Sequence, residues 1–285
     1  MKASFSIEPL TTNHLQESLQ LCRTAGWNQL QSDWERLLAH DPSGCFAAMA
    51  AGRLCGTVTT TAYGTDLAWI GMMLVVPEMR RQGIATALMQ RAIQYLHSCN
   101  VRCIKLDATP AGEHVYKQMG FVAQWSFHRW RRDARTQRGD KPGNGRAKPS
   151  TQELSPPLLE LDRAAFGADR SRLLSMLVGA AADLSAECCM VESGYGILRP
   201  GAVAAYLGPI VASNKEAARG LVQHLCECTE QPIFWDIPGP QCAGSELAVQ
   251  LGFSPVRDLV RMRLGPEIQA ADLDLLYALV DPSTG

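Results

Sequence analysis

The sequence has no excess of charge of either sign. It contains 27 lysines and arginines against 28 aspartates and glutamates, a formal net charge of −1. The surface as a whole is therefore not expected to attract nucleic acid or an anionic membrane. No apolar run approaches the roughly 18 residues that span a bilayer. The first residues include Glu8 and no continuous apolar segment, unlike a signal peptide. These absences favour a cytoplasmic protein without membrane or nucleic-acid partners.

Patterns that bind metal or form disulfides are also missing. The ten cysteines form no Cys-x-x-Cys pair. Cys188 and Cys189 are adjacent, whereas Cys226 and Cys228 lie two apart in a helix-like stretch and so point to different faces. We therefore expect reduced thiols rather than a disulfide or zinc framework, and no metal site.

The sequence does contain enough apolar material for two domains. Of its 285 residues, 46% are apolar and 19% are charged, which is a globular composition. Residues 132–152 are rich in Gly, Pro and basic residues and lack apolar periodicity, which predicts a solvated linker. Contact of its basic side chains with RNA or an acidic partner is the weaker alternative. We expect a first domain over 1–131 and a second over 153–285.

The first half alternates strands and helices, as an α/β domain does. Runs of β-branched and aromatic residues between Gly and Asp predict strands, and apolar residues three or four apart predict helices. The expected strands cover 4–10, 45–51, 54–63, 68–76, 101–108 and 121–130, and the expected helices 13–25, 33–40, 83–98 and 112–119. Asn13 and Ser32 are candidate N-caps of the first two helices.

The second half repeats the end of this order. Strands are expected at 206–212, 232–237 and 255–264, and helices at 215–228 and 245–251. The segment Val-Tyr-Lys-Gln-Met-Gly-Phe ending at Phe121 is echoed by Leu-Ala-Val-Gln-Leu-Gly-Phe ending at Phe253. Asp107 is likewise echoed by Asp236 at the end of the preceding strand. A repeat on this scale indicates duplication of one domain.

Residues 72–88 predict an anion-binding helix N-terminus. An apolar strand ends at Pro77, and a helix begins after Gly83. Unpaired N–H groups and the positive end of the helix dipole suit a diphosphate. Gly83 lets the backbone approach such a ligand, while Arg80 and Arg81 add positive charge. No Gly-Lys-Ser/Thr follows, so the loop is not a Walker A motif.

These residues resemble a known family. Arg80-x-x-Gly83-x-Ala85, following Val-Val-Pro, resembles motif A of the GNAT superfamily of N-acetyltransferases, and Tyr116-Lys-Gln-Met-Gly-Phe121 falls where the family has a related segment. The resemblance covers residues 4–130 and, through the repeat, the whole chain. The segments 26–29, 33–34, 106–112 and 161–170 are similar to a bacterial group of tandem-GNAT proteins. The resemblance implies two tandem GNAT-like α/β domains, each a mixed, mostly antiparallel twisted sheet flanked by helices.

The resemblance also implies acetyl-CoA as acetyl donor. The pantetheine would pair with backbone groups around Leu74 and Val76, and an N–H of Val75 or Val76 would hold the developing oxyanion. The diphosphate would lie on the loop and first helical turn. The residues implied for this second part are Arg80, Arg81, Gln82, Gly83, Ile84, Ala85 and Thr86, with Lys117 as a further phosphate contact or a solvated lysine.

Two side chains are candidates for proton transfer. Tyr116 matches the family tyrosine that protonates the departing thiolate, although it could instead be a core tyrosine beside Phe121. Asp107 ends the strand that leads to the cleft, so it would act as a base through water or would cap the next helix, as Thr109 also would.

The first two helices wall the acceptor site in this superfamily. Trp27, Asn28, Asp33 and Trp34 are therefore acceptor candidates, with two aromatic faces and a carboxylate for a cationic amine; packing between helices is the equal alternative. Asp236 in the second half is a further candidate for amine recognition.

The second half is expected not to use the coenzyme. It has no Arg-x-x-Gly-x-Ala loop, and Glu216 near its helix start would repel a diphosphate. Ala248 replaces the tyrosine at 116.

The sequence thus predicts direct transfer of an acetyl group from acetyl-CoA to a primary amine of a small molecule or peptide, in a ternary complex. A non-catalytic sensor of acyl-CoA or another small ligand, and an acyltransferase that uses a longer acyl-CoA, are the alternatives. The oligomeric state is open, with a homodimer as one option.

Overall fold

A computed structural model describes residues 4–134, 148–149, 153–179, 186–267 and 271–285. The expected linker at 132–152 therefore lies largely outside the described residues. No helix among the described residues is both long enough and apolar enough to cross a membrane.

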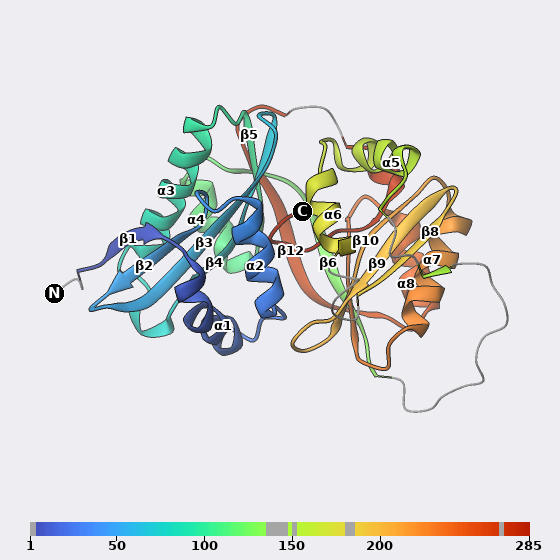
Figure 1. Ribbon diagram of the computed structural model, residues 1–285, viewed down its shortest axis with the longest axis horizontal. Coiled ribbons are helices and arrows are strands. Elements are labelled where there is room, and N and C mark those ends of the chain that lie inside the picture. Colours follow the sequence, from blue (N-terminus) through green and yellow to red (C-terminus); the bar gives the residue numbers. More distant parts are fainter. Residues whose placement is uncertain (1–3, 135–147, 150–152, 180–185, 268–270) are drawn as a thin grey trace. The chain divides into compact units, whose positions relative to one another are not determined.

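The chain divides into two compact units that do not coincide with its two halves (Figure 1). Unit 1 consists of Met1–Asp107, Arg263–Ile268 and Pro282–Gly285. Unit 2 consists of Ala108–Met262 and Gln269–Asp281. Each unit thus contains chain from both halves of the sequence.

Unit 1 is a twisted sheet with helices on its faces. Its strands follow the order β1-β2-β3-β4-β5. All neighbours are antiparallel except β4 and β5, which are parallel. The strands are β1 (Ser6–Pro9), β2 (Phe46–Ala50), β3 (Arg53–Tyr63), β4 (Leu67–Val75) and β5 (Cys103–Ala108), and the helices are α1 (Leu15–Thr24), α2 (Gln31–His40) and α3 (Ile84–Ser98).

The core of unit 1 follows from the apolar spacing of its helices. Leu15 and Leu19 on α1 and Trp34, Leu37 and Leu38 on α2 pack in one cluster with Met72 and Leu74 of β4. Helix α3 packs against β3 through buried residues at one-turn spacing, where Leu88 and Ile84 approach Gly56. Because Gly56 has no side chain, α3 can lie close to the strand.

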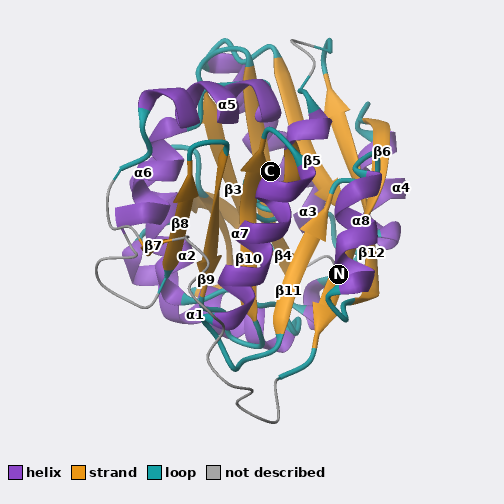
Figure 2. Cartoon of the chain, turned by 90° about the vertical axis from the view of Figure 1, so that its right-hand side faces the viewer, coloured by secondary structure: helices purple, strands orange, loops and turns teal. Residues whose placement is uncertain are grey.

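Unit 2 contains strands in the order β12-β6-β11-β10-β9-β8-β7. These strands are β6 (Val122–Arg132), β7 (Lys148–Pro149), β8 (Glu187–Val191), β9 (Gly194–Arg199), β10 (Ala205–Ala212), β11 (Ile233–Ile237) and β12 (Ser254–Leu264), and a short strand β13 (Leu276–Ala278) also pairs with β10. The helices are α4 (Pro110–Gln118), α5 (Pro156–Phe166), α6 (Ser171–Gly179), α7 (Lys215–Glu227) and α8 (Cys242–Gln250). Helix α7 lies against β9 and β10 (Figure 2).

Strand β6 comes from the first half of the sequence but is built into unit 2. It pairs antiparallel with β11, with Arg129 opposite Asp236 and Trp130 opposite Trp235. In exchange, Arg263–Ile268 of the second half belongs to unit 1. The sheet of unit 2 therefore depends on a strand that the first half supplies.

Most elements expected from the sequence are present within a few residues of the expected bounds. Two helix caps differ. Helix α2 begins at Gln31, so its N-cap is Leu30 and not Ser32. The Leu30 N–H donates a hydrogen bond to the Asp33 carboxylate at 2.8 Å. Asn13 lies inside a 3-10 turn before α1, where the Thr11 N–H bonds His14 Nδ1 at 3.0 Å. Helices α5 and α6 and strands β8 and β9, for which no expectation was stated, complete unit 2.

Candidate active site

Strand β4 contains a bulge just before its end. Thr57 pairs with Leu74 and Thr59 with Gly71, so the residues 72–73 of β4 face a single residue of β3. Met72 has a φ of 50°, and its carbonyl accepts a hydrogen bond from the Thr57 hydroxyl at 2.8 Å. A bulge turns the strand and ends regular pairing, so the last residues of β4 are directed away from a regular ladder.

The backbone beyond the bulge is open on the side of β5. The parallel pairing of β4 with β5 runs only from Leu67 to Trp69. On the other side, the Val76 N–H donates to the Cys55 carbonyl of β3 at 2.9 Å. Since backbone groups alternate along a strand, the groups of Val75 point away from β3. The N–H of Val75, and not that of Val76, is therefore the candidate oxyanion donor.

The Val75 carbonyl ties the following loop to the strand. It accepts a hydrogen bond from Arg80 Nε at 3.2 Å. This contact ties the Arg80 side chain to β4, although both Arg80 and Arg81 are exposed, and Arg81 has a φ of 61°. The alternation also means that Leu74 and Val76, named above for the pantetheine, pair with β3, so beyond the bulge the outward backbone groups are those of Val75.

Helix α3 begins with an uncapped N-terminus. Its N-cap is Gly83 with a φ of 89°, and no side chain of the described residues caps the first turn. A Cβ on Gly83 would meet nothing within 4 Å, so the space above the turn is open. The N–H groups of Ile84, Ala85 and Thr86 precede the first intrahelical bond, in which the Ala87 N–H bonds the Gly83 carbonyl at 3.0 Å. This arrangement suits a diphosphate.

The corresponding helix of unit 2, α7, is closed to such a ligand. Asn214 caps it through a bond from the Ala217 N–H to Asn214 Oδ1 at 2.9 Å. Lys215 Nζ is paired with Glu246 at 2.7 Å, and Glu216 places a carboxylate in the first turn. The N–H group that a phosphate would need is engaged, and the local charge is unfavourable.

The strand edge in unit 2 is closed as well. Strand β10 pairs in parallel with β11 only over Ala205–Leu207, and then with β13 through Ile210 and Val211. Two further bonds hold this segment: the Leu279 N–H to the Asp236 carbonyl (3.0 Å) and the Trp235 indole N–H to the Tyr277 carbonyl (2.8 Å). The chain's own backbone thus fills the opening that β4 leaves free. Sequence reasoning missed β13 because three residues carry no periodic signal.

Tyr116 lies on α4 in unit 2. Its ring makes an edge contact with Phe121, at 6.1 Å between centroids. Burial raises the pKa of its hydroxyl to about 12. Thr109 caps this helix by accepting from the Gly112 N–H at 3.2 Å, so helix capping falls to Thr109 and not to Asp107.

The other two charged candidates differ in their surroundings. Lys117 pairs with Glu113 one turn away, at 2.6 Å, and its side chain is half exposed. Asp107 is half-buried near the end of β5 in unit 1, and it makes contacts with its neighbours.

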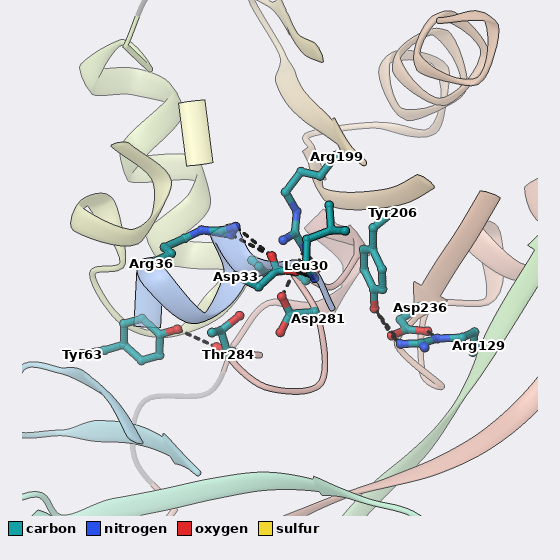
Figure 3. Close-up of polar contacts among 11 residues, drawn as sticks. Leu30, Asp33, Arg36, Tyr63, Arg129, Arg199, Tyr206, Asp236, Asp281 and Thr284 are labelled. Atoms are coloured by element: carbon teal, nitrogen blue, oxygen red, sulfur yellow. Dashed lines mark hydrogen bonds and ion pairs between the residues drawn. The ribbon is translucent and has the colours of Figure 1, made fainter. Parts of the chain in front are cut away.

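The acceptor candidates on the first two helices are mostly packed or paired. Trp34 has no exposed surface and lies in the core cluster of α1 and α2, so its side chain packs between the helices. Asp33 accepts from the Leu30 N–H and from Arg36, at 2.8 Å each (Figure 3). Asn28 is buried, and Trp27 is partly buried against the same cluster. Trp27 and Asp33 are thus the two members of the set that are only partly buried.

Asp236 is fully buried and already neutralised (Figure 3). Arg129 binds both of its oxygens, with Nε at 2.9 Å and Nη2 at 2.8 Å, and the Tyr206 hydroxyl also donates to it. A carboxylate with these partners has little capacity left for an amine. The sequence could not indicate Arg129, because it lies 107 positions away on a strand of the other half.

The last residues of the chain cover part of β3 and β4 in unit 1. The Tyr63 hydroxyl donates to the Thr284 carbonyl at 2.5 Å, and the Trp69 indole N–H donates to the Pro282 carbonyl at 3.3 Å. A Cβ on Gly71 would lie 2.4 Å from the Ser283 carbonyl oxygen, so backbone crosses β4 there. This contact had no sequence signal.

All ten cysteines are free thiols in the structure. Burial raises the pKa of Cys22 and of Cys45 to about 12 each, so these thiols stay protonated. Among the described residues, no group of three or more His, Cys, Asp or Glu side chains is placed to hold a metal ion.

Comparison with known proteins identifies both halves. A sequence model of the acetyltransferase (GNAT) family matches residues 11–121, and a model of an acetyltransferase (GNAT) domain matches residues 158–278. The uncharacterized N-acetyltransferase YitH of Bacillus subtilis is 25% identical over 255 residues, which cover 86% of each chain.

Solved structures share the fold. A presumed acetyltransferase from Pyrococcus horikoshii has a TM-score of 0.84 at 24% identity, covering 99% of this chain and 96% of that one. A tandem GNAT protein from the clavulanic acid biosynthesis pathway has a TM-score of 0.66 at 17% identity, covering 93% of this chain and all of that one. The chain therefore belongs to the GNAT acetyltransferase family, as an acyltransferase with two GNAT domains in tandem.

Proposed function

We propose that the chain transfers an acetyl group from acetyl-CoA directly to a primary amine of a small molecule or peptide, and that it binds one coenzyme, in unit 1. One contrast carries this proposal. The strand edge at Val75 and the helix start at Gly83 are open, whereas the matching edge and helix of unit 2 are filled by β13 and capped by Asn214.

In this proposal the residues of unit 1 bind and polarise the donor. The N–H groups at the start of α3 and the exposed Arg81 hold the diphosphate. The open end of β4 receives the pantetheine, and the Val75 N–H donates to the thioester oxygen as negative charge develops on it. Acetyl-CoA supplies the activated acyl carbon, and the neutral amine supplies the electron pair.

Two proton transfers complete the reaction. Tyr116 is the proposed acid that protonates the departing thiolate, and its high pKa keeps it protonated at neutral pH. Asp107 is the proposed base, acting through water on the amine, because an alkyl ammonium near pH 7 has no free electron pair. Cleavage of the carbon–sulfur bond then yields the amide and coenzyme A.

Calorimetric titration with acetyl-CoA tests this proposal, using wild type, Gly83→Glu and Tyr116→Phe. We expect one site per chain, lost in Gly83→Glu and kept in Tyr116→Phe, followed by thiol release with at least one member of an amine panel. Binding without thiol release from any amine would support the sensor. Tighter binding and faster release with a longer acyl-CoA would support the other alternative. No binding by wild type would reject acetyl transfer.

A further inference from the structure

One face of the sheet in unit 2 carries a cluster of charged side chains around Tyr206 (Figure 3). The Arg129 guanidinium lies 5.2 Å from the ring centroid of Tyr206, and so does that of Arg199. Arg129 pairs with Asp236, and Arg199 pairs with Asp281 at 3.1 Å and with the Val280 carbonyl at 2.7 Å. Each of the two carboxylates therefore already has a guanidinium partner.

A third guanidinium, that of Arg257, belongs to the same cluster. It lies on β12, the neighbour of β6, and its electrostatic partners are Arg129, Asp236 and Tyr206. Side chains four residues apart on a strand lie on the same face, so Arg257 shares a face of β12 with Arg261, and Arg129 shares a face of β6 with Trp125. The Arg261 guanidinium lies 4.5 Å from the ring centroid of Trp125, so these two faces are on the same side of the sheet. Arg257 is partly buried but still reaches solvent.

Arg257 makes no hydrogen bond or ion pair with any residue that the structure describes. Burial, followed by repulsion from Arg129, lowers its pKa. The cluster around Tyr206 thus contains three guanidiniums and two carboxylates, one positive charge in excess, beside the Arg261 guanidinium that stacks on Trp125. Such a charge is unfavourable unless a partner neutralises it.

We propose that Arg257 anchors a binding site for a carboxylate-bearing small molecule on this face of unit 2. A guanidinium binds a carboxylate through two parallel N–H bonds. One carboxylate, with a single negative charge, would balance the one positive charge in excess. A phosphate dianion is disfavoured, because it would meet Asp236 and Asp281 with a second uncompensated charge. This site is independent of acetyl transfer, and it places recognition of an anion on the unit whose coenzyme opening is closed.

The test uses the whole chain without acetyl-CoA and measures binding by calorimetry. The probes are N-acetyl-L-alanine, its uncharged amide of the same shape, and inorganic phosphate. The variants are Arg257→Gln, Arg257→Lys and, as a matched control, Arg219→Gln, whose side chain bonds Gln250 on α8. We expect the carboxylate to bind wild type and the control equally. Affinity should fall at least tenfold in Arg257→Gln and less in Arg257→Lys, which keeps the charge but not the paired donors.

Thermal unfolding separates a ligand site from a structural role. If Arg257 stabilised the fold, Arg257→Gln would lower the Tm; we expect an unchanged or higher Tm, because an uncompensated charge is removed. Equal binding of the amide, preferential binding of phosphate, full affinity in Arg257→Gln, a lower Tm in that variant or no binding of the carboxylate by wild type would each overturn the proposal. All of these outcomes are independent of catalysis, so they leave the acetyl-transfer proposal to its own test.

Discussion

The backbone N–H of Leu279 donates to the carbonyl oxygen of Asp236 at 3.0 Å, which fastens the segment after β13 to the end of β11. The corresponding strands in unit 1 are β4 and β5, and their pairing stops at Trp69. Duplicated domains that begin alike can therefore differ in coenzyme binding through a few residues of backbone. In unit 2 these residues occupy the strand edge that, in the proposed mode of binding, the pantetheine chain uses in unit 1.

The cap of α7 gives a prediction about this asymmetry. Asn214→Ala removes the acceptor for the Ala217 N–H and should lower the free energy of unfolding by about 1 kcal/mol. Acetyl-CoA affinity should stay within twofold of wild type, because the proposed coenzyme site is at α3 and not at α7. Urea unfolding and calorimetry check the two effects. A second coenzyme site, or a marked loss of affinity, would contradict the assignment to unit 1.

The pH dependence of turnover should reflect the buried hydroxyl of Tyr116. Its pKa is raised from 10.0 to about 12, so the acid form persists at alkaline pH. We therefore expect no loss of kcat from this group below about pH 10, and a fall of at least about 10²-fold in Tyr116→Phe. The measurement is kcat against pH with the best amine of the panel. An alkaline loss centred near pH 9 that the phenylalanine variant lacks would show that this hydroxyl titrates too early for the proposed role.

Burial of the same hydroxyl couples pH to stability. A raised pKa means that the folded state holds the proton more tightly than the unfolded state, so the stabilisation is complete below pH 10 and is lost between pH 10 and about 12. Unfolding measured between pH 9 and 12 should therefore show a steeper loss of stability in wild type than in Tyr116→Phe. Parallel curves for the two proteins would exclude this coupling.

Local sequence was sufficient for the strand, loop and helix at 72–88 and insufficient for the contacts that close unit 2. The strand, the Arg-x-x-Gly-x-Ala loop and the helix at 72–88 are contiguous, so chemistry and spacing predict their arrangement. The partner of Asp236 lies 107 positions away, and the residue that Tyr63 contacts lies 221 positions away. Propensity and periodicity describe neighbours along the chain and contain no information about such pairs. The amine-binding role first given to Asp236 came from its strand position alone.

The close crossing at Gly71 predicts a large cost for a small substitution. Gly71→Ala would place a methyl group 2.4 Å from the Ser283 carbonyl oxygen, so the terminal segment or β4 must shift. We expect a loss of about 1–3 kcal/mol in the free energy of unfolding. Gly220→Ala is the matched control: nothing lies within 4 Å of its added methyl group, and α7 should gain up to about 1 kcal/mol. Similar effects of the two substitutions in urea unfolding would mean that Ser283 does not constrain β4.

The buried Arg129–Asp236 pair should show strong non-additivity. Arg129→Met alone leaves a carboxylate buried without its main partner, as Asp236→Leu leaves a guanidinium, and each should cost about 3–5 kcal/mol. The double substitution should cost much less than the sum, because no unpaired charge remains. A double-mutant cycle from urea unfolding measures the difference. Additive losses would show that the two side chains are stabilised separately, with Tyr206 as the dominant partner of Asp236.

The exchange of chain between the units predicts that the halves cannot fold alone. A fragment ending at residue 134 would lack Arg263–Ile268 and Pro282–Gly285 of unit 1, and its β6 would lack β11. A fragment starting at 148 would lack β6, leaving β11 with an unpaired edge. We expect each fragment to be largely unfolded or aggregated by circular dichroism, and an equimolar mixture refolded together to regain the wild-type spectrum and coenzyme binding. An intact chain cut only between 134 and 148 is the control and should keep both. Cooperative unfolding of either fragment by itself would show that the compact units do not depend on the exchanged segments.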